Sequence, residues 1–299
     1  MVKAVLTAKI EPTYDDLPEE RYHFPSTYLA AIRQAVGDWV VYYEPRRSSE
    51  NESSRGGRLA YFGVARVVDV VEDPNRQGHY YAQIEGFLEF ARPVPFKEGS
   101  HYYEAALKKQ DGTTNKGAFG RAVRPLPDAE FEAIFKAGFA TVLTVDAAAL
   151  AARTPSMFED PAPFERPIIE RVIARPFRDA AFAAAVKEAY DATCAVTGLK
   201  IIDGGGRAEV QAAHIRPVNA GGSDSVRNGL ALCGTAHWMF DRGLISISDD
   251  FRILIAKDKL PEDARRLLRA DGRIQIPPRD EHHPSPASMR FHRDHVFKG

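Results

Sequence analysis

The sequence predicts an α+β protein built from two domains, and three observations lead to this prediction. The chain has 299 residues, which is enough for two domains with hydrophobic cores of their own. Its first half contains aromatic and β-branched runs separated by turn residues, whereas its second half mixes short strands with helices. Between residues 150 and 167 the composition changes to Ala, Pro and Ser, which is typical of a linker. We therefore expect domains at 1–145 and 175–299, joined by a linker at 146–174.

The first half is expected to be a small, partly open β-barrel. Its strand candidates, bounded by turn residues, are 37–44, 59–71 and 79–90. A polar, arginine-containing loop is expected between the first two of them. A short helix is expected at 28–36, and another from Asp128 as N-cap to Gly138 as the residue that ends it. A strand-rich segment with so little helix favours a barrel over a layered α/β domain.

The second half begins with the predicted amphipathic helix Asp179–Tyr190. Short strands and helices follow, and the chain ends in a histidine-rich segment. We expect these tail histidines to make docking contacts and not to bind metal: His282, His283, His292 and His295.

The composition excludes several classes of protein. Hydrophobic residues make up 44% and charged residues 27%, as in globular proteins and unlike disordered or fibrous ones. No run approaches the roughly 18 apolar residues that span a bilayer, and the start of the chain lacks a signal-peptide core, so we expect a cytoplasmic protein without a membrane partner. Two cysteines cannot form a disulfide framework or a four-cysteine zinc site. The net charge of −1 does not by itself indicate nucleic-acid binding.

The segment from Cys194 to Leu244 carries the residues that suggest chemistry. His237 and Asp241 are four positions apart, so on a helix they share a face and can bind one metal ion. One imidazole and one carboxylate suit Mg²⁺, Mn²⁺ or Zn²⁺, with positions left for water and phosphate. His214, on a predicted hairpin before this helix, is then free to act as general base on water.

This pattern resembles the HNH endonuclease family, whose ββα-metal motif is a hairpin followed by one helix. The resemblance covers about 175–251 and rests on CAVTG, AAHI, the Asn228 position, His237 and the FD pair after it. It implies that His214 is the general base and His237 a metal ligand. Asn228 would tie the hairpin to the following loop and orient His214, and Asp241 stands where relatives carry a second ligand. The implied cofactor is Mg²⁺ or Mn²⁺, with Zn²⁺ or Ni²⁺ as alternatives.

Two departures from the family pattern affect the metal sites. Many relatives have an acidic ligand just before the base, where this chain has Ala213. Glu209, Gln211 or a water molecule could supply the third ligand instead. Many relatives also hold a structural zinc with two CxxC pairs, but here each pair keeps only its first cysteine. We therefore expect no structural zinc, with Cys194 and Cys233 as small buried groups.

The first half is similar, more weakly, to the PUA-like superfamily that includes EVE, YTH and SRA domains. The similarity rests on the order YHFP, GDWVVYYEPRR, YFGVARV and HYYAQIEGFLEF. It implies an aromatic pocket for an extruded, modified base, for which the candidates are Tyr22, Phe24, Trp39 and Tyr43, although core packing is the alternative for each. The arginines of the predicted loop would contact phosphates, or would only be solvated: Arg46, Arg47, Arg55 and Arg58.

Together these resemblances imply a modification-dependent DNA endonuclease of the restriction type that defends bacteria against phage. Its partner would be double-stranded DNA with a modified base. One HNH site cuts one strand, so a double-strand break requires a homodimer or two successive nicks. The alternatives are an HNH nuclease acting on unmodified DNA or RNA, and a base-binding protein whose nuclease motif has decayed, for which Ala213 is the best argument.

Overall fold

The computed structural model describes residues 3–8, 16–45, 57–144 and 175–299. The chain divides into two units, 1–181 and 182–299, and the division falls within helix α6 (Arg175–Ala189). The predicted linker at 146–174 lies outside the described residues, so the predicted domain boundaries stay a prediction. The mixed α+β class is confirmed.

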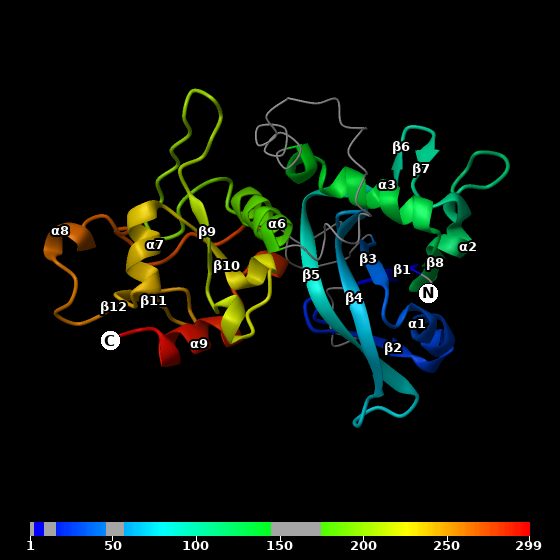
Figure 1. Cartoon of the computed structure of the whole chain (residues 1–299), viewed down its shortest axis with the longest axis horizontal. Helices are drawn as coiled ribbons and strands as arrows, with labels where there is room; N and C mark the ends of the chain where they lie inside the picture. Colours follow the sequence, from blue (N-terminus) through cyan, green and yellow to red (C-terminus); the bar gives the residue numbers. More distant parts are fainter. Residues whose placement is uncertain (1–2, 9–15, 46–56, 145–174) are drawn as a thin grey trace, which may run out of the picture. The chain divides into compact units, whose positions relative to one another are not determined.

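The first unit is built around a curled, half-barrel sheet of six strands (Figure 1). Their order across the sheet is β2-β5-β4-β3-β1-β8, and only the neighbours β1 and β3 run parallel. The strands are β1 (Lys3–Thr7), β2 (Arg21–Pro25), β3 (Trp39–Glu44), β4 (Ala60–Glu72), β5 (His79–Pro95) and β8 (Val123–Leu126). The pairing of β4 with β5 shifts register at three points, as β-bulges do where a sheet curls. The half-barrel agrees with the expected partly open barrel, while its assignment as PUA-like stays a prediction.

Short helices and one small hairpin complete the first unit. These elements are η1 (Ser26–Tyr28), α1 (Leu29–Ala35), β6 (Lys97–Glu98), β7 (His101–Tyr102), η3 (Ala105–Leu107), α2 (Lys116–Phe119) and α3 (Asp128–Gly138). Helix α3 buries Phe131, Ile134 and Phe135 along one side, as expected for an amphipathic helix.

Helix α3 has the bounds that the sequence predicted, but its ends are formed differently. Pro127 occupies the N-cap position and Asp128 is already helical; its carboxylate instead accepts a hydrogen bond from Lys3 Nζ at 2.6 Å. Gly138 does not end the helix by a left-handed turn. It lies so close to the Phe90 ring that an added Cβ would come within 2.5 Å of it. Glycine is therefore required here for close packing.

The second unit contains the predicted hairpin and helix in sequence. Strands β9 (Gln211–His214) and β10 (Gly229–Leu232) pair antiparallel, with His214 opposite Gly229, and α7 (Gly234–Asp241) follows. The remaining elements are η4 (Val218–Ala220), η5 (Val226–Asn228), β11 (Ile245–Ile247), β12 (Ile253–Ile255), α8 (Glu262–Arg265), η6 (Asp280–His282) and α9 (Pro286–His295). One hydrophobic core joins α6, the hairpin, α7, β11 and α9.

The C-terminal helix α9 is fixed to this core through His292. This side chain is 2% exposed, stacks on Phe240 and bonds to Ser246 Oγ and the Phe240 carbonyl oxygen at 2.8 and 3.1 Å. Burial lowers the pKa of His292 to about 4. His283 and His295 bond backbone carbonyl oxygens nearby. His292 therefore makes the kind of docking contact that the sequence predicted for the tail, whereas the contacts of His283 and His295 are local.

Candidate active site

The hairpin and α7 bring the predicted HNH residues into one unit with defined geometry. His214 is the last residue of β9, Asn228 precedes β10, and His237 and Asp241 lie on α7. A hairpin with a helix packed against it is the ββα arrangement that the sequence predicted. The hydrophobic core that the hairpin and α7 share fixes the backbone positions of these residues.

Asn228 connects the hairpin to the loop between its strands. It is 2% exposed, and its amide Nδ2 donates to the carbonyl oxygens of Arg216 and Ser223 at 2.9 and 2.8 Å. Its Oδ1 accepts from the Arg216 amide at 2.9 Å. Three hydrogen bonds from one buried side chain hold this loop against the end of β9, next to His214.

His214 is held on two sides. Its Nε2 lies 3.0 Å from Asp224 Oδ1, and its ring stacks on the Phe182 ring with centroids 3.9 Å apart. The His214 side chain is 19% exposed, whereas the Asp224 side chain is fully buried. An imidazole at the surface with a buried carboxylate behind it is a suitable arrangement for a general base.

His237 and Asp241 face each other on α7. His237 Nε2 lies 3.4 Å from Asp241 Oδ2, and His237 Nδ1 lies 2.9 Å from Gln211 Oε1. An amide oxygen only accepts, so Nδ1 carries a proton, and in the neutral imidazole that a metal ion binds the lone pair is on Nε2, facing Asp241. A lone pair and a carboxylate oxygen that face each other attract a cation between them, either a proton or a metal ion. The two donors therefore fit a divalent metal ion.

The structure places the candidate third ligands elsewhere. Gln211 Oε1 bonds Nδ1 of His237, the ring nitrogen that faces away from Asp241, as residues behind a metal-binding histidine commonly do. Glu209 accepts a hydrogen bond from the Gly234 amide at 2.9 Å, at the start of α7. Within the described ranges, no three His, Cys, Asp or Glu side chains gather into a group that could hold a metal ion. Water and substrate phosphate are left to complete the coordination.

Sequence patterns did not indicate two residues of this site, Asp224 and Phe182, or the supporting role of Gln211. Asp224 lies ten residues after His214, in the loop between Gly222 and Asn228. Because this loop returns the chain to the hairpin, an acidic residue in it could have been predicted to lie near His214. Phe182 comes from the predicted amphipathic helix, and nothing in its spacing distinguishes it from other core aromatics.

The two cysteines are free and buried, as small core groups are. Thr197 Oγ1 lies 3.9 Å from Cys233 Sγ, so threonine stands beside the cysteine where many HNH relatives have a further thiolate. The second position of each pair is Thr197 or Ala236, and neither a hydroxyl nor a methyl group replaces a thiolate as a zinc ligand.

The comparisons with known proteins identify this region. A family model described as HNH endonuclease matches residues 194–248. The chain contains an HNH endonuclease domain. HNH domains hydrolyse phosphodiester bonds and use a divalent metal ion. The matched segment lies in the second unit, and His214, Asn228 and His237 lie within it.

Two solved structures align with most of the chain at low identity and low TM-score. The modification-dependent TagI restriction endonuclease is 19% identical, with 89% of this chain and 64% of that one covered and a TM-score of 0.30. The type IV phosphorothioation-dependent restriction endonuclease ScoMcrA is 15% identical, with coverages of 98% and 56% and a TM-score of 0.22. The chain thus spans less than two thirds of either protein. No curated protein matches it significantly. Among the described residues, no helix has the length and apolar character needed to cross a membrane.

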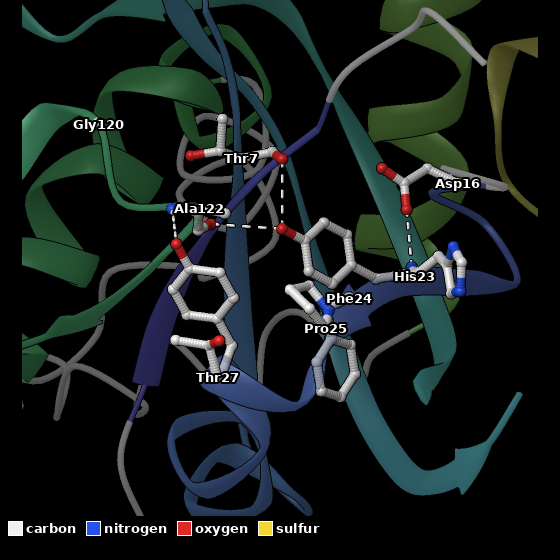
Figure 2. Close-up of a pocket in the computed structure, with 10 residues that line it drawn as sticks. Thr7, Asp16, His23, Phe24, Pro25, Thr27, Gly120 and Ala122 are labelled. Carbon is white, nitrogen blue, oxygen red and sulfur yellow. Dashed lines mark hydrogen bonds between the residues drawn. The ribbon is translucent and has the colours of Figure 1, made fainter. Parts of the chain in front are cut away.

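In the first unit, two of the four candidate base-binding residues line a cavity of about 290 Å³ (Figure 2). Tyr22 and Phe24 contribute stacked rings from β2. The Tyr22 hydroxyl lies 3.3 Å from the carbonyl oxygens of both Thr7 and Ala122, which share its single proton. The remaining walls are Asp16, His23, Pro25, Thr27, Tyr28 and Gly120. This volume suits one small ring system and lies just below the range of about 300–1,000 Å³ for drug-sized ligands.

The structure places Trp39 and Tyr43 in the buried part of the unit, outside the lining of this cavity. Tyr43 is fully buried, packs edge-on against Tyr61 and Phe119, and has the Arg124 guanidinium 5.3 Å from its ring centre. Burial raises the pKa of Tyr43 above its usual range. These are contacts of a core residue, and base binding by Trp39 and Tyr43 stays a prediction.

The candidate phosphate contacts fall into two groups. Arg46, Arg47 and Arg55 lie outside the described residues. Arg58 is buried and pairs with Glu44 at 2.8 Å and with Glu89 at 3.2 Å. It would have to leave both carboxylates to reach a phosphate, so the contact that the sequence predicted for Arg58 requires a rearrangement.

Proposed function

We propose that this protein is a modification-dependent DNA endonuclease, which recognises a modified base through its first unit and cuts the backbone with its HNH domain. The observation that carries the nuclease half is the ββα arrangement of His214, Asn228, His237 and Asp241 within the matched segment. The aromatic cavity beside β2 supports the recognition half.

In the proposed reaction, His214 takes a proton from a water molecule through Nδ1. The resulting hydroxide attacks phosphorus, the bond from phosphorus to the 3′ oxygen breaks on the opposite side, and the 3′ oxygen takes a proton from solvent. His237 and Asp241 would hold the divalent cation, which stabilises the negative charge of the transition state. Asn228 keeps the loop beside His214 in place throughout.

The cavity of the first unit offers what an extruded base needs. Tyr22 and Phe24 line the cavity with rings that are otherwise buried in the core, and Asp16 and Gly120 belong to its polar lining. Extrusion costs a few kcal/mol, which stacking and contacts to the added chemical group can offset. The proposed partner is therefore double-stranded DNA with a modified base, bound by a cytoplasmic protein that acts as a homodimer or nicks twice.

Cleavage of matched plasmids tests this function. Plasmids that carry no modification, methylcytosine, hydroxymethylcytosine, methyladenine or phosphorothioate linkages are incubated with Mg²⁺ or Mn²⁺. We expect cutting of one base-modified plasmid and little cutting of the unmodified one. Equal cutting of all plasmids indicates a nuclease that ignores modification. Binding without cutting indicates a decayed nuclease, and a preference for phosphorothioate contradicts recognition of a base.

His214→Ala is the matching test of the site. A general base contributes about 10²–10⁴-fold to rate and little to affinity for the ground state, so cleavage should fall by that factor. DNA binding and the melting temperature should stay close to wild type. A purified variant that cuts at the wild-type rate would remove His214 from the mechanism.

A further inference from the structure

The loop between β9 and β10 carries a buried carboxylate that the HNH residues do not account for. Asp224 Oδ1 lies 3.0 Å from Nε2 of His214, and the Asp224 side chain has no exposed surface. A charged group taken out of water is costly unless it is paired and hydrogen-bonded. The chain nevertheless places this carboxylate directly behind the proposed base.

This contact determines which nitrogen of His214 carries the proton. An ionised carboxylate only accepts hydrogen bonds, so the group that faces it must be Nε2–H. In a neutral imidazole the proton is then absent from Nδ1, whose lone pair is available to accept a proton from water. Without the carboxylate, both tautomers compete, and the one protonated on Nδ1 cannot act as base there.

The surroundings hold this pair in one geometry. Asn228 Nδ2 donates to the carbonyl of Ser223, the residue before Asp224, and also to that of Arg216 near the end of β9. The two partners are therefore tied together through one amide. Phe182 stacks on the His214 ring with planes 13° apart, which fixes the plane in which Nε2 points at the carboxylate.

We propose that Asp224 is the positioning residue of the nuclease site: it sets the tautomer and orientation of His214 and thereby keeps Nδ1 ready to deprotonate water. Asn228 acts through it, by holding the Asp224 loop against β9. This inference rests on the proposed function, since it assigns Asp224 to the same cleavage reaction.

Asp224→Asn is the first test, because the amide has the same shape and lacks the charge. The amide can present its NH₂ group to the imidazole and so favour the wrong tautomer. Loss of the residue that orients a metal-bound histidine typically costs about 10–100-fold, and we expect a loss of the same order for this proposed base. We expect kcat on the cleaved plasmid to fall by this factor, with KM within about twofold of wild type. Asp224→Glu should recover part of the loss. Asp271→Asn, in an exposed ion pair with Arg269, is the matched control and should cut normally.

A double variant separates positioning from folding. If Asp224 acts through His214, adding Asp224→Asn to His214→Ala should lower the residual rate no further. A purely structural role would lower the rate in both backgrounds and would lower the melting temperature as well. Either a full additive loss or wild-type cutting by Asp224→Asn would overturn the proposal.

The tautomer itself can be observed without any cleavage assay. Long-range ¹H–¹⁵N spectra of the full chain, with the His214 signals assigned by their absence in His214→Ala, should show Nε2 protonated and Nδ1 bare. Asp224→Asn should change these nitrogen shifts, and Asp271→Asn should not. A His214 protonated on Nδ1 in the wild type overturns the inference. If the spectra agree but no plasmid is cut, the proposed function fails while the His214–Asp224 pair stands.

Discussion

At the scale of single residues, spacing located the reactive groups of the second unit but not their supporting partners. The i, i+4 rule placed His237 and Asp241 on one helix face, and the structure has their donor atoms 3.4 Å apart. Asp224 and Gln211 could not be placed in the same way, because their contacts depend on how a loop closes and on which strand residue faces α7. Local periodicity carries no information on either.

The metal pair gives the first prediction at this scale. His237→Ala and Asp241→Asn should each shift the Mn²⁺ or Mg²⁺ dependence of cleavage to higher concentration, because each removes one of two protein ligands. Gln211→Leu should lower the affinity for the metal ion by about 10–100-fold, because His237 loses the hydrogen bond that orients it. Thr235→Ala, on an exposed position of α7, is the control. If Asp241→Asn leaves the titration curve unchanged, the second ligand lies elsewhere.

Gly222 gives the second residue-scale prediction. A Cβ at this position would lie 1.9 Å from the Arg216 carbonyl oxygen and 2.8 Å from Asn228 Nδ2. Gly222→Ala must therefore displace the loop that Asn228 holds, and we expect about 1–3 kcal/mol of destabilisation together with a loss of cleavage. Gly204→Ala has open space around it and should change neither. Denaturant unfolding and plasmid cutting measure both effects, and an unaffected Gly222→Ala would show that the loop yields easily.

At the scale of elements, the strands with clear sequence patterns were predicted and the others were not. The predicted strands at 37–44, 59–71 and 79–90 correspond to β3, β4 and β5. Strand β1 was not predicted, and all five of its residues are buried, as in a strand that is covered on both faces. Strand β8 contains Pro125, which argues against a strand in sequence but is tolerated at the edge of the sheet. Long-range pairing therefore had to come from the structure.

Helix α9 gives a prediction for pH dependence. The pKa of His292 is about 4 in the folded chain, below the usual value of 6.5, because burial disfavours its charged form. Between these two values the unfolded chain binds more protons, so stability is complete above about pH 6.5 and falls as the pH drops towards 4. The loss from this group should approach about 3 kcal/mol.

The slope of unfolding free energy against pH tests this account of α9. His292→Gln removes the titrating group and should flatten the slope between pH 6.5 and 4, at the cost of lower stability near neutral pH. His295→Gln, on the same helix, should keep the wild-type slope. A slope unchanged by His292→Gln would mean that this histidine is not held neutral in the folded unit.

At the scale of the whole molecule, the proposal divides recognition and cleavage between the two units. The nuclease half was predictable because an HNH site is a short, local constellation on one hairpin and one helix. The recognition half was less predictable, because aromatic residues pack cores and line pockets alike. Tyr22, Phe24 and Tyr43 are all buried, and only the fold shows that the first two border the cavity while Tyr43 does not.

If the first unit recognises the base, a substitution that fills its cavity without removing any core group should abolish recognition. Thr27 lines the cavity and is exposed, so Thr27→Trp should fill the space that a base would enter and leave the melting temperature unchanged. Ser26→Trp adds the same bulk next to the cavity and is the control. In the non-cutting His214→Ala chain, Thr27→Trp should erase the preference for modified over plain duplex and leave the weak, salt-sensitive binding to phosphates.

Tyr43→Ala should instead lower stability by about 3–5 kcal/mol, as truncation of a buried aromatic does. Residues 1–145 alone should keep the preference if the first unit recognises the base by itself. Equal affinity of this fragment and of the full chain for both duplexes would contradict base recognition by the first unit.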